Sequence, residues 1–356
     1  MSFEKFGFKK FVNDGIEKSG FLEPTPIQNE VIPLIKKHKN VVALAHTGTG
    51  KTHAFLLPII NNLDFQQSQK VQAVVIAPTR ELAKQIYDNL KLFVTANSEL
   101  TTELYMGGTD IQRDIASLTK KQPMMIVGTP TRLKELYLNH ALFLTTTDYV
   151  VVDECDMIFD LGFLEDLDFL LSKMKKEVVL AFFSATINKQ LQQYLKKYLK
   201  NVFFVDVTQK KITNKNIQHL LIETKNRDLE ETFKKIVRAI NPYLCLIFVN
   251  NKNQVPIFVD YLHNLGIQHV GELHGDLQPR TRMAMLKKIK NNDFKYVVAT
   301  DVAARGVDIE GISHVISISL PVDVNYYIHR SGRTGRKDFS GNSYVLANLE
   351  NQAKIE

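Results

Sequence analysis

The stretch VVALAHTGTGKTHAF, residues 41–55, joins an apolar run to a glycine-rich segment and then to a helix-like pattern. The apolar run is built of Val, Ala and Leu, which is typical of a strand buried on both faces of a parallel sheet. Ala45, four further residues and then Gly50, Lys51 and Thr52 match the phosphate-loop pattern, except that the general pattern begins with Gly. The stretch therefore predicts an α/β fold with a nucleotide site.

The residues of this loop have separate expected roles. Gly48 and Gly50 allow backbone N–H groups to turn inward around an anion. Lys51 can reach the outer phosphates, and the Thr52 hydroxyl can ligate Mg²⁺. The alternative is a glycine-rich turn that precedes a lysine by chance. The candidate ATP-binding residues of the loop are Thr47, Gly48, Thr49, Gly50, Lys51 and Thr52.

Similar apolar runs recur along the chain and alternate with amphipathic, helix-like stretches. Alternation of this kind predicts parallel sheets covered by helices. A polar and basic segment without periodicity, 208–217, is expected to be a linker. The sequence thus predicts two α/β domains, 1–207 and 218–356. The runs expected to be strands are 41–45, 73–79, 124–130, 149–154 and 178–186 in the first domain, and 219–224, 243–250, 296–301, 314–320 and 343–348 in the second.

Composition limits the classes of function. The length of 356 residues suits two domains, and the net charge of +7 favours an anionic partner such as nucleic acid. The only cysteines, Cys155 and Cys245, cannot build a disulfide framework or a four-ligand zinc site, which favours a reducing, cytoplasmic setting. No run approaches eighteen consecutive apolar residues, so no membrane span is expected.

Acidic residues follow the apolar run at 149–152. A phosphate loop needs a second, acidic contribution to hold its metal, at the carboxyl end of a neighbouring strand. Asp153 is expected to hold Mg²⁺, and Glu154 to orient or deprotonate the attacking water. Mg²⁺ prefers oxygen ligands, so Cys155 is expected to be a small packed hydrophobe, with a redox role as the alternative.

The order of these motifs resembles that of the DEAD-box family of ATP-dependent RNA helicases, through nearly the whole chain. The segments at 45–52 and 153–156 resemble its first two motifs, with Cys155 where Ala is usual. The resemblance implies an α/β fold of two tandem RecA-like parallel-sheet domains joined by a short linker. Further segments that match are GFLEPTPIQ at 20–28, SAT at 184–186, TDVAARGVD at 300–308 and HRSGRTGR at 329–336.

The resemblance assigns nucleotide roles outside the loop. Gln28 would bond the adenine edge, and Phe3 would stack on the ring, which suits an amide and an aromatic face. Arg333 and Arg336 would be arginine fingers that stabilise charge on the γ-phosphate, and Asp308 would contact the ribose or help to set that geometry.

The resemblance also assigns RNA-facing and coupling residues. Ser184 and Thr186 would bond the acids of 153–156 and couple hydrolysis to strand separation. The RNA-facing groups favour sugar and phosphate over base edges, so little sequence specificity is expected, and the choice of RNA over DNA rests on the resemblance. The RNA-binding candidates are Thr79, Arg80, Gly107, Gly108, Thr131, Arg132, Asn250, Arg282 and Thr300.

Two positions depart from the family pattern. Ser331 stands where an apolar residue is common, and Pro279 stands where the family's Gln-x-x-Arg motif has Gln, although Arg282 keeps its Arg. The first departure is expected to change little, and the second to loosen one RNA or interdomain contact.

The expected function is that of an RNA-dependent ATPase and RNA helicase that uses ATP and Mg²⁺ and acts as a monomer on single-stranded RNA or short duplexes. An ATP-gated RNA clamp and a DNA-directed translocase remain alternatives. No membrane partner is expected, and partners in ribosome assembly, RNA decay or cold adaptation remain open.

Overall fold

The fold is that of a computed structural model, which describes residues 2–46, 48–187, 189–199, 201–208, 216–224, 227–304, 309, 311–320, 327, 330–335 and 340–347. The chain divides into two compact units, Met1–Lys210 and Lys211–Glu356. Most of the expected linker, 209–215, lies outside the described residues.

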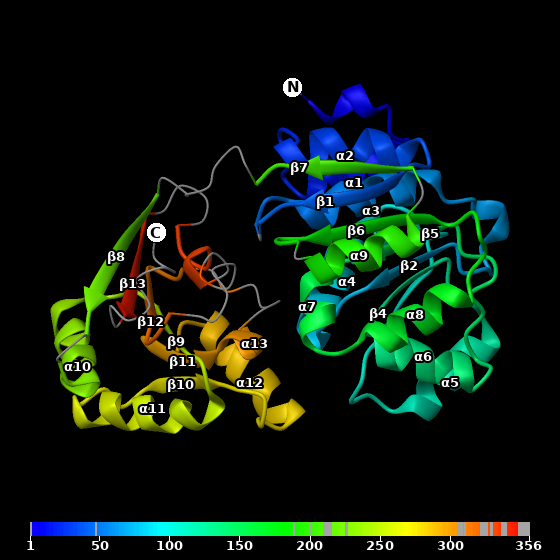
Figure 1. The fold of residues 1–356 in the computed structure, drawn as a ribbon. Helices are drawn as coiled ribbons and strands as arrows, with labels where there is room; N and C mark the ends of the chain where they lie inside the picture. The colour runs from blue at the N-terminus through cyan, green and yellow to red at the C-terminus, as the bar shows by residue number, and fades with distance from the viewer. Residues whose placement is uncertain are drawn as a thin grey trace. The chain divides into compact units, whose positions relative to one another are not determined.

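The first unit alternates strands and helices (Figure 1). Its strands are β1 (Asn40–Leu44), β2 (Ala73–Ile76), β3 (Thr102–Tyr105), β4 (Met125–Gly128), β5 (Tyr149–Val152), β6 (Val179–Ser184) and β7 (Val202–Asp206). Its α-helices are α1 (Lys10–Lys18), α2 (Pro26–Lys36), α3 (Lys51–Asn62), α4 (Arg80–Val94), α5 (Ile111–Lys120), α6 (Pro130–Leu138), α7 (Cys155–Asp160), α8 (Leu164–Ser172) and α9 (Lys189–Tyr198). Short 3-10 helices, η1 and η2, span Phe3–Phe6 and Phe65–Gln67.

The seven strands of this unit form one sheet in the order β3-β4-β2-β5-β6-β1-β7, and every neighbouring pair is parallel. Successive side chains of a strand point to opposite faces, so both faces need an apolar cover. In β5, Tyr149 and Val151 pack with helices α1 to α4, whereas Val150 and Val152 pack with α5 to α9. Continuous apolar runs are therefore required, because each strand contributes to two cores.

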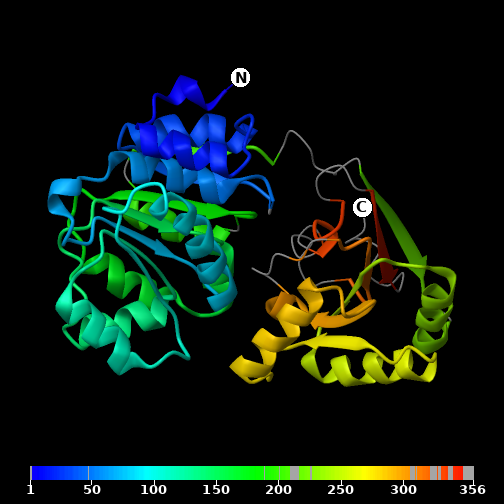
Figure 2. The same cartoon turned by 180° about the vertical axis from the view of Figure 1, so that it is seen from behind.

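The second unit repeats this arrangement, as the reverse view shows (Figure 2). Its strands are β8 (Ile217–Glu223), β9 (Cys245–Val249), β10 (Val270–Leu273), β11 (Tyr296–Thr300), β12 (His314–Ser317) and β13 (Gly341–Ala347). Its helices are α10 (Leu229–Ala239), α11 (Val255–Asn264), α12 (Pro279–Lys290) and α13 (Asp301–Ala304), with a 3-10 helix η3 at Lys252–Gln254.

The sheet of the second unit has the order β10-β11-β9-β12-β13-β8, again with all neighbouring pairs parallel. Helices α10 and α11 bury their apolar residues on one face, and α12 and α13 bury theirs on the other. Two parallel-sheet α/β units confirm the predicted fold class. Within the part of the chain that the structure describes, no helix is long and apolar enough to cross a membrane.

Three strands were not among the predicted runs: β3, β7 and β10. Each lies at the end of a sheet and has one strand neighbour. Exposed or half-buried residues interrupt their apolar pattern, as in Thr102 to Leu104 of β3 and Val202 to Phe204 of β7. An edge strand does not need the continuous apolar run that a central parallel strand needs.

Candidate nucleotide and RNA sites

The strand order of the first unit sorts the predicted motifs into two groups. All strands are parallel, so the segments that follow them lie at one edge of the sheet, where α/β proteins bind ligands. The phosphate loop (45–52), the acidic segment (153–156) and the SAT segment (184–186) follow β1, β5 and β6, which are contiguous. The RNA-facing candidates of this unit follow β2, β3 and β4, which are contiguous as well.

The phosphate loop is held by its glycines and by Gln28. Gly48 and Gly50 have φ of 80° and 91°, in the left-handed region that favours glycine. The Gln28 Nε2 donates to the Gly50 carbonyl at 3.1 Å, and a Cβ on Gly50 would lie 2.5 Å from that nitrogen. The Thr49 hydroxyl donates to the His46 carbonyl at 2.8 Å. Thr47 lies outside the described residues.

Lys51 and Thr52 begin helix α3 directly after the loop. Lys51 is buried, with 7% of its surface exposed, and its Nζ has no hydrogen-bond partner among the described residues. A buried ammonium without a partner is costly, and an anion at the loop would satisfy it. The position therefore fits a phosphate group.

Asp153 and Glu154 follow β5 as buried acids. Burial raises the pKa of the Asp153 carboxyl to about 6, although the charge of Lys51 and the hydrogen bond from the Glu154 N–H oppose the rise. Glu154 has φ of 46°, a left-handed conformation that is unfavourable for a residue with a side chain. Strain and buried charge thus coincide at the acidic segment.

The SAT segment contacts the last acid of this segment. The Thr186 hydroxyl donates to Asp156 Oδ2 at 2.8 Å, and the Ser184 hydroxyl accepts from the Asp156 N–H at 3.3 Å. Strand β6, which carries Ser184, lies between β1 and β5. The segment is therefore in contact with the acids through Asp156, and its strand is the neighbour of both nucleotide-facing strands.

The two adenine candidates lie in different surroundings. Gln28 is buried and accepts through Oε1 from the Thr25 N–H at 2.9 Å, while its Nε2 contacts the phosphate loop. Phe3 is buried in the first core, and its ring centre lies 6.1 Å from that of Phe6. The structure thus brings Gln28 into contact with the loop and places Phe3 in the core of the unit.

Cys155 behaves as a packed hydrophobe. Its side chain is fully buried in the second core of the first unit, and burial raises the pKa of its thiol. The described residues contain no cluster of three His, Cys, Asp or Glu side chains that could hold a metal by themselves. A single buried carboxylate is nevertheless what a magnesium–nucleotide complex needs, because Mg²⁺ keeps waters and phosphate oxygens as its other ligands.

Among the RNA-facing candidates, Arg80 lies over the glycine pair. A Cβ on Gly108 would lie 2.4 Å from Arg80 Nη1, and one on Gly107 would lie 3.2 Å from Nη2. Thr79 caps helix α4 by accepting from the Leu82 N–H at 3.2 Å. These segments follow different strands, and their close packing makes one continuous surface.

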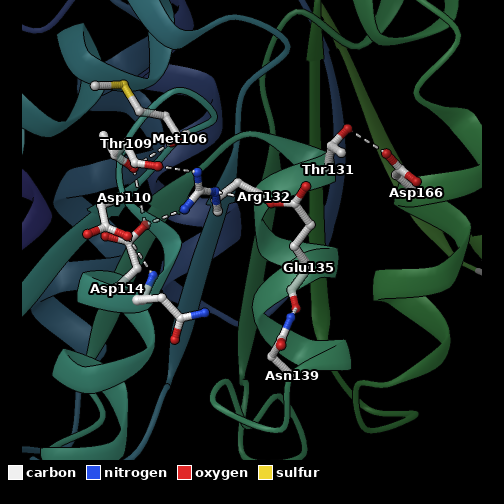
Figure 3. A network of polar contacts seen from close by, with 10 residues as sticks. Met106, Thr109, Asp110, Asp114, Thr131, Arg132, Glu135, Asn139 and Asp166 are labelled. Carbon is white, nitrogen blue, oxygen red and sulfur yellow. Dashed lines mark hydrogen bonds and ion pairs between the residues drawn. The ribbon is translucent and has the colours of Figure 1, made fainter.

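Arg132 is held inside the protein (Figure 3). Its Nη1 donates to Asp114 Oδ2 at 2.8 Å, its Nη2 donates to the Thr109 carbonyl at 2.8 Å, and its Nε lies 3.3 Å from Glu135 Oε2. The side chain is 5% exposed. Arg132 therefore ties α6 to α5 and to the loop that carries the glycine pair.

Thr131 also lies on α6, and it bonds to a helix on the side away from Arg132 (Figure 3). Its hydroxyl donates to Asp166 Oδ2 at 2.7 Å, and Lys134 contacts the other oxygen of Asp166 at 2.8 Å. Asp166 lies on α8. Helix α6 is thus fastened to α5 through Arg132 and to α8 through Thr131 and Lys134.

In the second unit the predicted RNA-facing residues follow contiguous strands. Asn250 follows β9, Thr300 ends β11, and Arg282 lies on α12, which follows β10; the sheet order is β10-β11-β9. The Arg282 Nη2 donates to the Ala303 carbonyl at 2.8 Å. The carboxyl edge of this sheet therefore carries a second group of RNA candidates.

Arg330 was not predicted as a site residue, and it connects three strand ends at this edge of the sheet. Its guanidinium donates to both oxygens of Asp301 at 2.7 and 2.6 Å, to Asn250 Oδ1 at 2.6 Å and to the Ser319 carbonyl at 2.9 Å. The residue is 1% exposed and lies over the Phe248 ring. Arg330 therefore holds the ends of β9, β11 and β12 together.

The other arginine-rich positions are only partly described. Arg333 is buried, and its N–H donates to the Arg330 carbonyl at 3.1 Å. Ser331 is buried too, and its carbonyl accepts from the Thr334 N–H. Pro279 is the first residue of α12, where the absence of an N–H costs nothing. Asp308 and Arg336 lie outside the described residues.

Two parallel α/β units, the first with a phosphate loop beside a buried Asp-Glu pair, define the class of P-loop nucleotide hydrolases. Residues 25–194 match the family described as DEAD/DEAH box helicase, and residues 224–338 match the helicase conserved C-terminal domain. The chain therefore belongs to the DEAD-box family of ATP-dependent RNA helicases, which are ATP-hydrolysing enzymes. The predicted resemblance and enzyme class are confirmed.

Known relatives cover almost the whole chain. It is 44% identical to the DEAD-box ATP-dependent RNA helicase CshB of Listeria monocytogenes, over 97% of this chain and 79% of the relative. It is 41% identical to CshB of Bacillus subtilis, over 98% and 80%. Dbp5 of S. cerevisiae bound to RNA and ADP BeF3 has a TM-score of 0.89 and 27% identity, over 99% of this chain and 91% of that one.

The Arg132–Asp114 pair gives a first test. Asp114→Ala leaves the buried Arg132 guanidinium without this partner, and Arg132→Ala leaves the partly buried Asp114 carboxylate without its cation. Either is expected to destabilise the chain by about 2–4 kcal/mol. The double substitution should cost less than the sum, with a coupling energy of about 0.5–3 kcal/mol in urea unfolding. The exposed pair Lys84–Asp88, at 2.9 Å, is the control, for which about 0.3–0.5 kcal/mol is expected. Equal couplings for the two pairs would contradict a fastening role for Arg132.

The raised pKa of Asp153 gives a second test. The free energy of unfolding is measured against pH, with a chelator present and without nucleotide. The folded state binds the proton more tightly than the unfolded state, so this carboxyl destabilises the fold above about pH 6 and ceases to do so as the pH falls toward 4. Asp153→Asn should therefore be more stable than wild type at neutral pH, by about 1–3 kcal/mol. The difference should shrink toward zero between about pH 6 and 4. A pH-independent difference in the free energy of unfolding would refute this.

Proposed function

We propose that this chain binds the sugar–phosphate backbone of RNA without sequence specificity, hydrolyses ATP with Mg²⁺ when RNA is bound, and opens short duplexes locally. The observation that carries the proposal is the strand order, which sorts the ATP-facing and RNA-facing motifs of the first unit into two contiguous groups. Closely similar architecture in Dbp5, described as bound to RNA and ADP BeF3, supports both ligands.

The nucleotide is held by the first unit in this proposal. The buried Lys51 ammonium contacts the outer phosphates, with the N–H groups of Thr47, Gly48, Thr49 and Gly50 around them. Thr52 and Asp153 hold Mg²⁺, which supplies charge neutralisation at the phosphates. Glu154 accepts the proton of the attacking water.

The second unit and the SAT segment complete the proposed machinery. Arg333 and Arg336 stabilise negative charge on the γ-phosphate, and Asp308 contacts the ribose. Ser184 and Thr186 act as positioning residues, because Thr186 fixes the carboxylate next to the catalytic pair.

Gln28 keeps hydrogen-bonding positions for adenine even though its side chain already bonds the phosphate loop. A side-chain amide has two N–H donors and two acceptor positions on its oxygen. The bonds to Gly50 and Thr25 use one donor and one acceptor position. One N–H and one lone pair are left for a base edge, and adenine presents N7 and N6–H to them. Phe3 is proposed to contribute an aromatic face to the same base.

RNA is proposed to lie along both carboxyl edges. Its phosphates contact hydroxyl, guanidinium and backbone groups, which accounts for low sequence specificity. Arg132 takes part by positioning α6, since its guanidinium is engaged within the protein. The proposed contact residues are Thr79, Arg80, Gly107, Gly108 and Thr131 in the first unit and Asn250, Arg282 and Thr300 in the second.

The remaining proposals concern organisation. The helicase domains are 1–207 and 218–356, joined by the linker 208–217. The protein acts as a monomer in the cytoplasm, where its two buried cysteines stay reduced. Ribosome assembly and RNA decay are the processes in which its RNA and partners are to be sought.

ATP hydrolysis is expected to require both RNA and Mg²⁺. Glu154→Gln should keep ATP binding and slow RNA-stimulated turnover by about a hundredfold or more, the loss expected for a positioned base. Steady-state ATPase assays with and without RNA, and with and without a chelator, test this. A strand-displacement assay on a short duplex is run in parallel. Full turnover without RNA would contradict the proposal. RNA-stimulated turnover without strand displacement would favour a clamp.

The base preference is expected to be adenine over guanine. Guanine presents an acceptor where adenine has its N6–H donor, so a buried polar group would be left unpaired, at about 1–3 kcal/mol or roughly tenfold to a hundredfold in affinity. Gln28→Ala should reduce the preference, whereas Phe3→Ala should weaken ATP and GTP alike. Competition binding measures both. GTP that competes as well as ATP on the wild type would refute adenine reading by Gln28.

A further inference from the structure

Helix α12 has an unusual charge composition. Its sequence, PRTRMAMLKKIK, contains five Arg and Lys residues and no Asp or Glu. On two other helices an exposed lysine pairs with an acid four residues away, Lys10 with Asp14 on α1 and Lys84 with Asp88 on α4. A helix that carries only positive charge lacks this local compensation.

The cations of α12 share its solvent face. Leu286 and Ile289 are buried in the core beneath the helix, whereas Arg280, Lys287, Lys288 and Lys290 are exposed. At 3.6 residues per turn, Arg280 and Lys287 point within about 20° of one another and lie about 10 Å apart along the axis. Lys288 and Lys290 flank this line. These four residues are called the basic face of α12.

No acid neutralises this face in the part of the chain that the structure describes. None of its four cations lies within ion-pair distance of a described carboxylate, whereas Lys252, on the preceding 3-10 helix, pairs with Asp276 at 2.9 Å. Asp293 follows the helix, and the described contacts give it no ion pair with these residues. The positive potential of the face is therefore uncompensated, and an anionic partner would be attracted to it.

The face is continuous with the proposed RNA contacts of the same unit. Arg282 lies two residues after Arg280, and Asn250 and Thr300 stand at the ends of strands β9 and β11. Helix α12 follows β10, which neighbours β11 and ends the sheet. A strand that leaves these residues past Arg280 would meet the basic face along α12.

We propose that the basic face of α12 is a second RNA-binding surface that holds phosphates of the RNA beyond the motif residues. A stacked strand carries a phosphate about every 3.4 Å along its axis, so the distance from Arg280 to Lys287 corresponds to about three phosphates. Lysines serve as point charges for phosphate and read no base, in keeping with low sequence specificity. The inference rests on the proposed function and adds the direction in which the bound RNA continues.

The test compares Lys287→Gln/Lys290→Gln with a matched control. Lys235→Gln/Arg238→Gln removes two exposed charges at the same spacing from α10 of the same unit. Affinity is measured against salt for a short oligouridylate of about 8 nucleotides and a long one of about 20, lengths that bracket the proposed motif track. Thermal unfolding checks that both variants fold as the wild type does.

For the long RNA, the α12 variant should lose affinity about tenfold at moderate salt, and the slope of log affinity against log salt should decrease by about 1.4. The α12 variant should bind the short RNA as the wild type does. The control variant should bind both RNAs as the wild type does. An α12 variant that equals wild type on the long RNA overturns the inference, as does an equal loss on both lengths or in the control.

Two more results would separate failure of the proposed function from a different role of the basic face. Wild-type protein that binds neither RNA refutes the proposed function itself, and the basic face as an RNA surface with it. Binding to phosphatidylglycerol vesicles that the α12 substitutions abolish, with RNA affinity unchanged, would assign the face to a lipid surface and overturn the inference.

Discussion

A buried lysine and a buried aspartate meet at one edge of the first sheet, and the rest of the site depends on them. Both charges are costly where they stand, because burial raises the pKa of Asp153 to about 6 and the buried Lys51 ammonium has no hydrogen-bond partner among the described residues. The backbone beside Asp153 is strained, with positive φ at Glu154, whereas the positive φ of the phosphate loop falls on Gly50, which adopts it readily. In the proposed function, the phosphates of ATP and a divalent cation supply the opposite charges at this edge of the sheet.

Parallel strands explain why so many functional segments can share one edge. In a parallel sheet every strand end at that edge carries a loop, and the order of strands decides which loops are neighbours. The first sheet places β6 between β1 and β5, so the SAT segment follows a strand next to both nucleotide-facing strands. In the proposed function, the same order leaves β3, β4 and β2 together for RNA. The proposed coupling between ATP and RNA therefore has one sheet to pass through, with Thr186 and Asp156 in contact at its edge.

The central strands could be predicted because their burial on two faces demands continuous apolar runs, and the family motifs could be located because they follow those runs. The edge strands β3, β7 and β10 could not, since Val202 to Phe204 and their counterparts are partly exposed and lack the pattern. At the site, sequence identified residue types but not their partners. Arginine commonly binds RNA phosphates, so the sequence pointed to Arg132 as an RNA contact. Only the fold reveals that its guanidinium donates to Asp114 and to the Thr109 carbonyl.

Arg330 shows the same effect in the arginine-rich motif of the second unit. A guanidinium has five N–H donors, and the contacts to Asp301, Asn250 and Ser319 engage four of them inside the protein. Little capacity is left for a phosphate, so an arginine in such a motif can serve as a fork that joins strand ends rather than as a ligand. The sequence did contain a signal for this use, because Asp301 follows β11 directly and a carboxylate at the end of a buried strand is stabilised by a cation. The basic face of α12 differs in this respect, because none of its cations forms an ion pair with a carboxylate of the described residues.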